Sequence, residues 1–209
     1  MSLSRACQAC FPAAGCGRFI AANAPGARTE ATAWNDGAGN LWLFGGVGWD
    51  SNGGNGVLND LWRYNLTSRL WTWIGGSNVV NASGAYGTQG TAAARNVPGA
   101  RFSAIPFTDG IGNLWLFGGL GADANGTGGQ LNDLWQYNPS SGQWTWVSGA
   151  DSVFAVSVYG TERTPAPANV PGSDLYMISR TDTVGNFWLL GGTGNAATSS
   201  GSLNTLWKY

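Results

Sequence analysis

The sequence contains no histidine and a single lysine, Lys208, among its 209 residues. Without histidine the chain lacks the commonest general base, the commonest metal ligand and the side chain that changes charge near neutral pH. The usual pairs of a serine or cysteine nucleophile with a histidine base cannot form from these residues. We therefore predict that the chain is not an enzyme, with no catalytic residues, no metal and no cofactor.

Charge of either sign is scarce as well. Ten Lys plus Arg and eleven Asp plus Glu give a net charge of −1, and only 10% of the residues are charged, against about 25% in an average domain. Such a chain cannot neutralise many phosphates, so we expect no nucleic-acid partner.

Long apolar runs are missing too. No segment has the ~20 consecutive apolar residues of a membrane span, and residues 1–22 lack the ~7–15-residue apolar centre of a secretory signal. The near absence of Lys and Glu beside many Asn, Gly, Ser, Thr and Trp residues resembles exported or cell-surface proteins, although no signal peptide is recognisable in this chain.

Glycine and tryptophan are abundant instead, with 34 and 12 residues, and 43% of the chain is hydrophobic. This composition favours short, tightly turned strands with aromatic packing. The octet GNLWLFGG at Gly39–Gly46 returns unchanged at Gly112–Gly119, and as GNFWLLGG at Gly185–Gly192, each time 73 residues further on. A fixed period of this kind indicates one supersecondary unit used three times.

A full unit contains four short segments with the alternation or the apolar character of strands, separated by Gly, Asn and Asp turns. In the first unit they are Arg28–Trp34, Leu41–Phe44, Leu61–Tyr64 and Trp71–Trp73. Four antiparallel strands per repeated unit predict the blades of a β-propeller. We expect the recurring tryptophans to pack between blades.

The motifs within the unit resemble the kelch repeat. A hydrophobic strand ends on a Gly-Gly pair such as Gly45 and Gly46, and a Tyr is followed seven positions later by a Trp, as in Tyr64 with Trp71 and Tyr137 with Trp144. The unit departs from the family in its length of 73 residues, against about 50 in kelch repeats. The resemblance implies a propeller that binds other molecules through loops on one face, like the kelch-type central domain of galactose-oxidase-like enzymes.

We assign residues 1–27 to a poorly ordered or linker-like N-terminal segment and residues 28–209 to the propeller, with blades at 28–73, 101–146 and 174–209. The third unit is degenerate and stops before a fourth strand: Asp174 replaces Arg28 and Arg101, and Thr205 replaces Asp60 and Asp133. Propellers usually close with four to eight blades. The chain is therefore expected to be part of a longer propeller, or to pair with a second copy into a six-bladed ring.

Long loops are expected between the second and third strands, about Val47–Val57 and Leu120–Gln130, and between blades, about Ile74–Gly99 and Val147–Gly172. By strand direction these loops share one face, and loops on a rigid scaffold often carry binding sites. Our candidate ligand-binding residues are Trp49, Asp50, Tyr86, Arg101, Asp123 and Tyr159. Trp49 stands out because Ala122 and Asn195 occupy its position in the other units.

Three further features have less specific interpretations. Cys7, Cys10 and Cys16 could form a disulfide, stay as free thiols or, with a further ligand, bind zinc. Asp50-Ser51-Asn52-Gly53 resembles the start of a calcium loop, but no Glu follows at the required distance and Asn-Gly is an ordinary turn signal. Arg28 and Arg101 are expected near the central channel, paired with Glu30 or a loop carboxylate, or forming an anion site.

We thus expect a non-catalytic binding or interaction module whose loop face meets a protein or a carbohydrate. Two alternatives remain: a fragment of a larger carbohydrate-active or galactose-oxidase-like enzyme, and a structural unit that self-assembles through blade edges.

Overall fold

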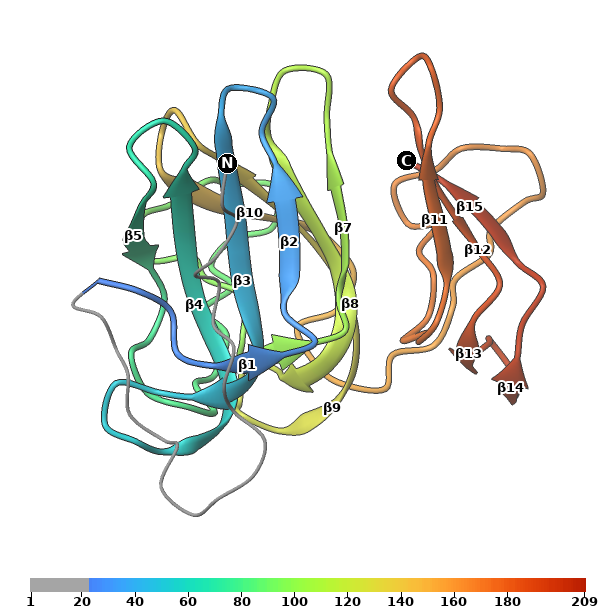
Figure 1. Cartoon of the computed structure of the whole chain (residues 1–209). Coiled ribbons are helices and arrows are strands. Elements are labelled where there is room, and N and C mark those ends of the chain that lie inside the picture. Colours follow the sequence, from blue (N-terminus) through green and yellow to red (C-terminus); the bar gives the residue numbers. More distant parts are fainter. Residues whose placement is uncertain (1–22) are drawn as a thin grey trace.

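The computed structural model describes residues 23–209, and its strands form three main antiparallel sheets that follow the three repeats (Figure 1). The segment 1–22, which holds the three cysteines, lies outside the described residues. Residues 23–209 contain strands, turns and bends but no helix. The predicted all-β fold class is confirmed.

We call the sheets blade 1, blade 2 and blade 3. Blade 1 contains β1 (Arg28–Thr29), β2 (Thr32–Asn35), β3 (Asn40–Trp49), β4 (Asn55–Asn65) and β5 (Leu70–Gly75). Blade 2 contains β6 (Arg101–Phe102), β7 (Ile105–Thr108), β8 (Leu114–Ala122), β9 (Gly128–Asn138) and β10 (Gln143–Ser148). Blade 3 contains β11 (Ile178–Thr181), β12 (Phe187–Leu190) and β15 (Leu206–Lys208), beside the hairpin of β13 (Thr193–Asn195) and β14 (Ser200–Ser202).

The predicted first strand is broken in two. Glu30 and its repeat equivalent Ser103 have left-handed backbones, with φ of 55° and 53°. The break separates β1, which pairs with the second half of β3, from β2, which pairs with the first half. The predicted strand Arg28–Trp34 is therefore wrong in its continuity, since residues 30 and 31 form a kink that sequence alternation did not reveal.

The Gly-Gly pair explains where that kink falls. Gly45 and Gly46 have φ of 65° and 93°, and the β3–β4 register shifts by a bulge between Phe44 and Gly46. A Cβ on Gly46 would lie 2.6 Å from the Thr29 carbonyl oxygen. Only glycine fits both the left-handed backbone and this close approach of β1.

The predicted loops 47–57 and 120–130 are mostly strand, so this prediction was wrong. The β3–β4 ladder continues through Val47↔Val57 to Trp49↔Asn55, and the connecting loop is only residues 50–54. The β8–β9 hairpin likewise extends to Ala122↔Gly128. Glycines here had indicated a loop, but Gly48 is needed because a Cβ would lie 2.7 Å from the Arg28 Cβ.

The links between blades begin beside these hairpin ends, as predicted. Ser51 N–H donates to the Asn78 carbonyl, and Ala124 N–H donates to the Asp151 carbonyl. The first link then follows the outer edge of blade 2, where Ala93 pairs with Trp144 in β10.

The core lies between the blades, and the inner strands β2, β7 and β11 are neighbours. One buried cluster joins blades 1 and 2 through residues such as Trp42, Phe44 and Trp135, and a second joins blades 2 and 3 through Phe117, Phe187 and Leu189. The Trp34 indole N–H crosses between blades to the Trp115 carbonyl at 2.8 Å. Sheets packed side by side around their inner strands make a partial β-propeller-like arrangement.

Candidate functional site

A buried arginine–aspartate pair holds each of the first two blades together. In blade 1 the Arg28 guanidinium donates to both carboxylate oxygens of Asp60, at 2.5 and 2.8 Å. Arg101 and Asp133 repeat this contact in blade 2 at 2.6 and 2.8 Å. The bidentate geometry ties β1 to β4 in blade 1 and β6 to β9 in blade 2. Arg28 was expected to pair with Glu30 or a loop carboxylate, which is wrong, because Glu30 instead accepts from the Ser103 hydroxyl.

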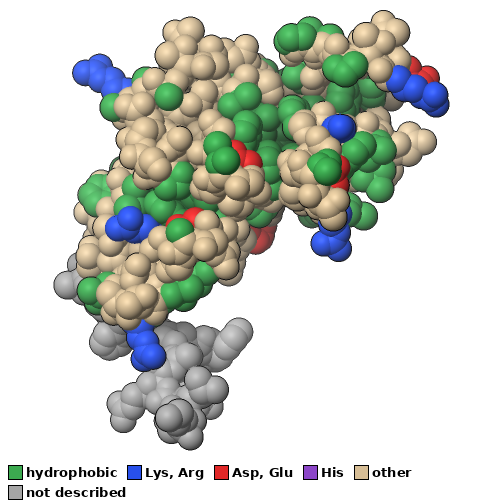
Figure 2. All heavy atoms as spheres, turned by 90° about the horizontal axis from the view of Figure 1, so that it is seen from above, with side chains coloured by type: hydrophobic (Ala, Val, Ile, Leu, Met, Phe, Trp, Pro, Cys, Tyr) green, Lys and Arg blue, Asp and Glu red, His purple; other side chains and the backbone are tan. Residues whose placement is uncertain are grey.

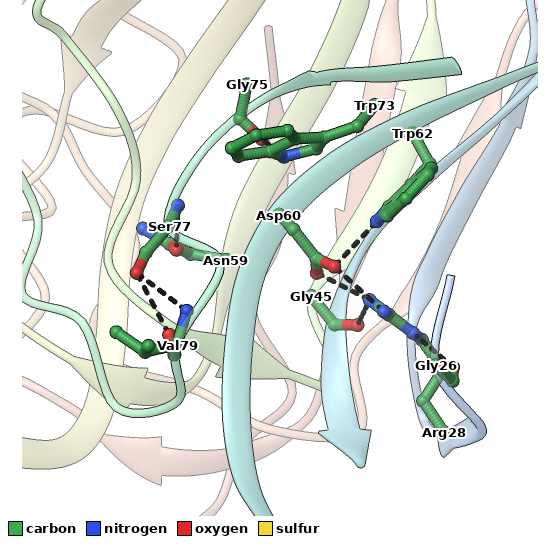
Figure 3. A network of polar contacts seen from close by, with 10 residues as sticks. All are labelled: Gly26, Arg28, Gly45, Asn59, Asp60, Trp62, Trp73, Gly75, Ser77 and Val79. Carbon is green, nitrogen blue, oxygen red and sulfur yellow. Dashed lines mark hydrogen bonds and ion pairs between the residues drawn. The ribbon is translucent and has the colours of Figure 1, made fainter. Parts of the chain in front are cut away.

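The aspartate also orders the aromatic residues around it. In blade 1 the Trp62 indole N–H donates to Asp60 Oδ2 at 2.6 Å, and Figure 3 shows Arg28, Asp60 and Trp62 joined in this network with Trp73 close by. The Trp73 indole N–H donates to the Gly75 carbonyl at 2.7 Å. Trp135 and Trp146 make the same contacts in blade 2.

In blade 2 a tyrosine from the preceding link completes this cluster. The Tyr86 hydroxyl donates to Asp133 Oδ2 at 2.6 Å. Its ring lies 4.9 Å from the Trp135 ring and 5.2 Å from the Trp146 ring, centroid to centroid. Burial and the negative charge of Asp133 raise the pKa of Tyr86 well above its usual range, so its hydroxyl stays a proton donor. Blade 2 is therefore closed by its own tyrosine.

Blade 1 has a cavity in the corresponding place. Its volume is about 210 Å³, and its lining includes Arg28, Trp49, Asp50, Asp60, Trp62 and Trp73. The repeat equivalent of Tyr86, 73 residues earlier in the sequence, is Ala13, which has no aromatic ring and lies outside the described residues. Asp60 Oδ2 accepts two hydrogen bonds, whereas Asp133 Oδ2 accepts three. The cavity therefore combines an aromatic wall with a carboxylate oxygen that can take one more donor.

The mouth of the cavity is formed by the end of the β3–β4 hairpin. Trp49 is 42% exposed there, whereas the equivalent Ala122 of blade 2 is buried. Asp50 orders the hairpin loop, since its carboxylate accepts from the backbone N–H groups of Asn52, Gly54 and Val80. These backbone hydrogen bonds, that of Gly54 foremost, lower the pKa of Asp50.

The six predicted site residues fall in three different places. Trp49 and Asp50 line the blade 1 cavity. Asp123 is the blade 2 equivalent of Asp50 and caps its hairpin loop through Asn125 and Thr127 N–H. Tyr86 and Arg101 are buried inside blade 2, with exposures of 5% and 0%, so we no longer place them in a ligand site. Tyr159 lies beside blade 3, where its ring stacks on Trp207 at 5.4 Å.

Most of the cavity lining was not predicted as a site, including the four residues of its polar and aromatic cluster. Arg28 was expected near a central channel, Asp60 at a strand entry, and Trp62 and Trp73 in the packing between blades. Trp73 is instead 46% exposed. The sequence contained a signal that Arg28 and Asp60 act as a pair. Both residue types recur in the second unit, as Arg101 and Asp133. Both are replaced in the third unit, by Asp174 and Thr205.

The metal hypotheses find no site among residues 23–209. The described chain contains no group of three or more His, Cys, Asp or Glu side chains arranged to hold a metal ion, and Asp50 and Asp123 act as turn caps. The cysteine cluster lies outside the described residues. No helix that could cross a membrane was found in the part of the chain described.

Comparison with known proteins adds little. No protein-family profile matches the sequence, and no curated protein matches it. Among solved structures, one described as "Structure of YjhT" is similar, with 16% sequence identity and a TM-score of 0.44. The similarity covers 80% of this chain and 59% of that chain, so the present chain spans less than two thirds of its length.

Proposed function

We propose that this chain is a non-catalytic binding module built from kelch-like repeats, and that the blade 1 cavity receives a tyrosine side chain of a protein partner. The observation that carries the proposal is the difference between equivalent positions. Tyr86 fills the cluster of blade 2, whereas no side chain of residues 23–209 fills the same cluster in blade 1.

The contacts in blade 2 supply a geometry for the partner's ring. A phenol ring in the cavity would pack between Trp62 and Trp73, as Tyr86 packs between Trp135 and Trp146. Its hydroxyl would donate to Asp60 Oδ2, and the two hydrogen bonds from Arg28 would hold that carboxylate in place. The exposed Trp49 adds a third aromatic surface at the mouth, where aromatic anchors typically contribute much of the binding energy.

On the opposite end of the blades, which Figure 2 shows from above, Lys, Arg, Asp and Glu side chains are few and scattered. The cavity itself fits an uncharged polar partner, because Asn23, Ser51 and Asn78 line it beside Trp49. Affinity from this surface would therefore depend little on salt, because long-range charge attraction is small.

Binding of N-acetyl-tyrosinamide, measured by calorimetry, tests the proposal, with N-acetyl-phenylalaninamide as the probe that lacks the hydroxyl. We expect the tyrosine probe to bind at least tenfold more tightly, since only it can donate to Asp60. Trp49→Ala should weaken binding, and Ile111→Ala, at an 87% exposed position outside the cavity, should not.

A carbohydrate partner is the second candidate, because an exposed tryptophan such as Trp49 can stack on a sugar ring. A panel of simple glycosides distinguishes the two. Trp49-dependent binding of a glycoside without binding of the tyrosine probe would replace the protein partner by a carbohydrate, and turnover of a glycoside would contradict the non-catalytic function.

A further inference from the structure

Blade 3 replaces both members of the buried ion pair. Asp174 stands at the position of Arg101 in blade 2, and Thr205 stands at the position of Asp133. The tryptophan that follows two residues later is kept, as Trp207. A carboxylate has therefore taken the place of a guanidinium, and a hydroxyl has taken the place of a carboxylate.

The backbone around this place is the same in the two blades. Gly191 and Gly192 have left-handed φ of 67° and 109°, close to the 58° and 96° of the Gly-Gly pair in blade 2. Leu175 exchanges both backbone hydrogen bonds with Thr193, at the point where β6 pairs with β8 in blade 2. Blade 3 thus keeps the walls of the space that holds Arg101, although the arginine itself is lost.

These walls present acceptors for a cation. In blade 2 the Arg101 guanidinium donates to the backbone carbonyls of Gly99 and Gly118, at 3.1 Å each. The equivalent carbonyls in blade 3 belong to Gly172 and Gly191. An aspartate has no side-chain N–H, so these two carbonyls lose the donor that their counterparts have.

Three side-chain atoms of the cluster are buried without a hydrogen-bond partner among residues 23–209: Asp174 Oδ2, Thr205 Oγ1 and Trp207 Nε1. Their counterparts in blade 2 are joined by hydrogen bonds of 2.6, 2.8 and 2.7 Å. Asp174 is 2% exposed, and its other oxygen accepts from the Asn195 N–H at 3.1 Å. Buried polar groups are nearly always hydrogen-bonded, so three unpartnered atoms in one cluster indicate a bound group.

The charge of the cluster shows what kind of group is missing. Arg101 and Asp133 neutralise each other in blade 2, whereas Asp174 forms no ion pair within residues 23–209. Burial raises the pKa of Asp174. An ionised carboxylate that is buried without a counter-charge is costly, so this side chain needs either a proton or a cation.

We propose that blade 3 binds a hard cation, such as calcium or sodium, in the place of the missing guanidinium. Oxygen atoms of this kind are the ligands that hard cations take. The protein ligands are Asp174 Oδ2, Thr205 Oγ1 and the carbonyl oxygens of Gly172 and Gly191. A water molecule on the cation accepts from Trp207 Nε1.

This site was not expected from the sequence. It differs from the calcium-loop and cysteine hypotheses because it contains a single carboxylate and otherwise uncharged oxygens. It is also independent of the blade 1 cavity, since it shares no residue with the lining of that cavity.

The test measures the melting temperature of the full chain at pH 7, after dialysis against a chelator and then into tetramethylammonium chloride. Calcium chloride and sodium chloride are added in separate series at constant ionic strength. We expect one of the two cations to raise the melting temperature by about 3–6 °C at about ten times its dissociation constant. The series that responds identifies the cation.

Two single variants locate the effect. Asp174→Asn keeps the shape of the side chain but removes its charge, and should abolish the response to the cation. Only the response is compared, because without the cation this variant also avoids the unpaired charge. Glu162→Gln is the matched control, since it removes a carboxylate from a side chain that is 85% exposed, and it should keep the full response.

A double variant rebuilds the arrangement of the other blades. Asp174→Arg combined with Thr205→Asp restores the ion pair that blades 1 and 2 contain. This chain should lose the response to the cation and, without the cation, should melt above the unaltered chain.

The proposal is overturned if neither cation stabilises the unaltered chain, or if Asp174→Asn responds as strongly as Glu162→Gln. Circular dichroism checks that each variant is folded. If Asp174→Asn does not fold, the double variant decides the question, because an undiminished response in it would place the cation elsewhere.

Discussion

Blades 1 and 2 share the residues around their buried ion pair but differ in one aromatic ring. In blade 2, Tyr86 covers the pair, and Arg101 and Asp133 are 0% exposed at their side chains. In blade 1 the side chains of Arg28 and Asp60 are 5% and 9% exposed, and a cavity opens onto them. The same cluster thus serves as a closed structural core in one blade and as an open pocket in the next.

Blade 3 extends this comparison. Asp174 is buried at the position of the two arginines, but Thr205 stands where the aspartates were, and Asp174 Oδ2 has no hydrogen-bond partner. Blade 2 is the blade in which the arginine, the aspartate, the tyrosine and the outer strand occur together. Blade 3 keeps the tyrosine, Tyr159, which stacks on Trp207, but not the arginine or the aspartate.

The largest effect is expected from breaking the closed cluster. Asp133→Ala leaves the fully buried Arg101 cation without its partner, which typically costs about 3–5 kcal/mol of unfolding free energy. Asp60→Ala should cost less, because water reaches Arg28 through the blade 1 cavity. Urea denaturation of both variants checks the order, and an equal loss would remove the distinction between the two blades.

The next largest effect is expected from the tyrosine hydroxyl. Tyr86→Phe keeps the ring between Trp135 and Trp146 but removes the donor to Asp133 Oδ2, and should cost about 1.5–3 kcal/mol, the usual range for a hydrogen bond to a charged group. Tyr64→Phe is the control, since the Tyr64 ring packs against Trp71 and its hydroxyl makes no hydrogen bond within residues 23–209. A loss no greater than that of the control would mean that the hydroxyl does not stabilise blade 2.

A smaller effect is expected in blade 3, where the substitution should raise the stability of the fold instead of lowering it. Burial raises the pKa of Asp174 above its usual value of 3.8, so ionisation of this group disfavours the folded state. At low pH Asp174 is protonated in both the folded and the unfolded chain, and its burial then carries no charge penalty. The free energy of unfolding declines as the pH rises from about 3.8 through the raised pKa. Asp174→Asn should raise the melting temperature at pH 7 and leave it nearly unchanged at pH 3.5. A lower melting temperature at pH 7 would show that the carboxylate is stabilised by contacts.

The smallest effect on stability is expected at the mouth of the cavity. Trp49→Ala should change the unfolding free energy by less than about 0.5 kcal/mol, as is usual for surface positions, while it weakens binding of the tyrosine probe. Parallel urea denaturation and calorimetry measure the two effects. A large loss of stability would make Trp49 a packing residue rather than part of a binding site.

Much of the fold could be predicted from the sequence because the repeat is regular. The 73-residue period and the Gly-Gly pairs identified three units, and the Trp-Thr-Trp segments identified the outer strand of the first two. The kink at Glu30 could not be predicted, since it is imposed by the bulge at Gly45 and Gly46 on the neighbouring strand. The long hairpins were missed because Gly48 indicated a loop, whereas it stands in a strand that another backbone approaches closely.

The candidate site could be predicted only in part. Trp49 was identified because it breaks the repeat, and it lies at the mouth of the cavity. Asp60 was read as a turn residue because its partner, Arg28, is 32 residues away in the sequence. Tyr86 and Arg101 lie in loop and strand-end segments that looked accessible, and only the packing of blade 2 shows that they are buried.

The central claim is that the blade 1 cavity holds a phenol ring as blade 2 holds Tyr86. The most direct test is to follow the indole N–H signals of the ¹⁵N-labelled chain by NMR while p-cresol is added, with toluene as the ligand that lacks the hydroxyl. The account predicts that p-cresol shifts the signals of Trp62 and Trp73, leaves those of Trp135 and Trp146 in place, and acts more strongly than toluene. Unchanged Trp62 and Trp73 signals, or equal effects of the two ligands, would contradict it.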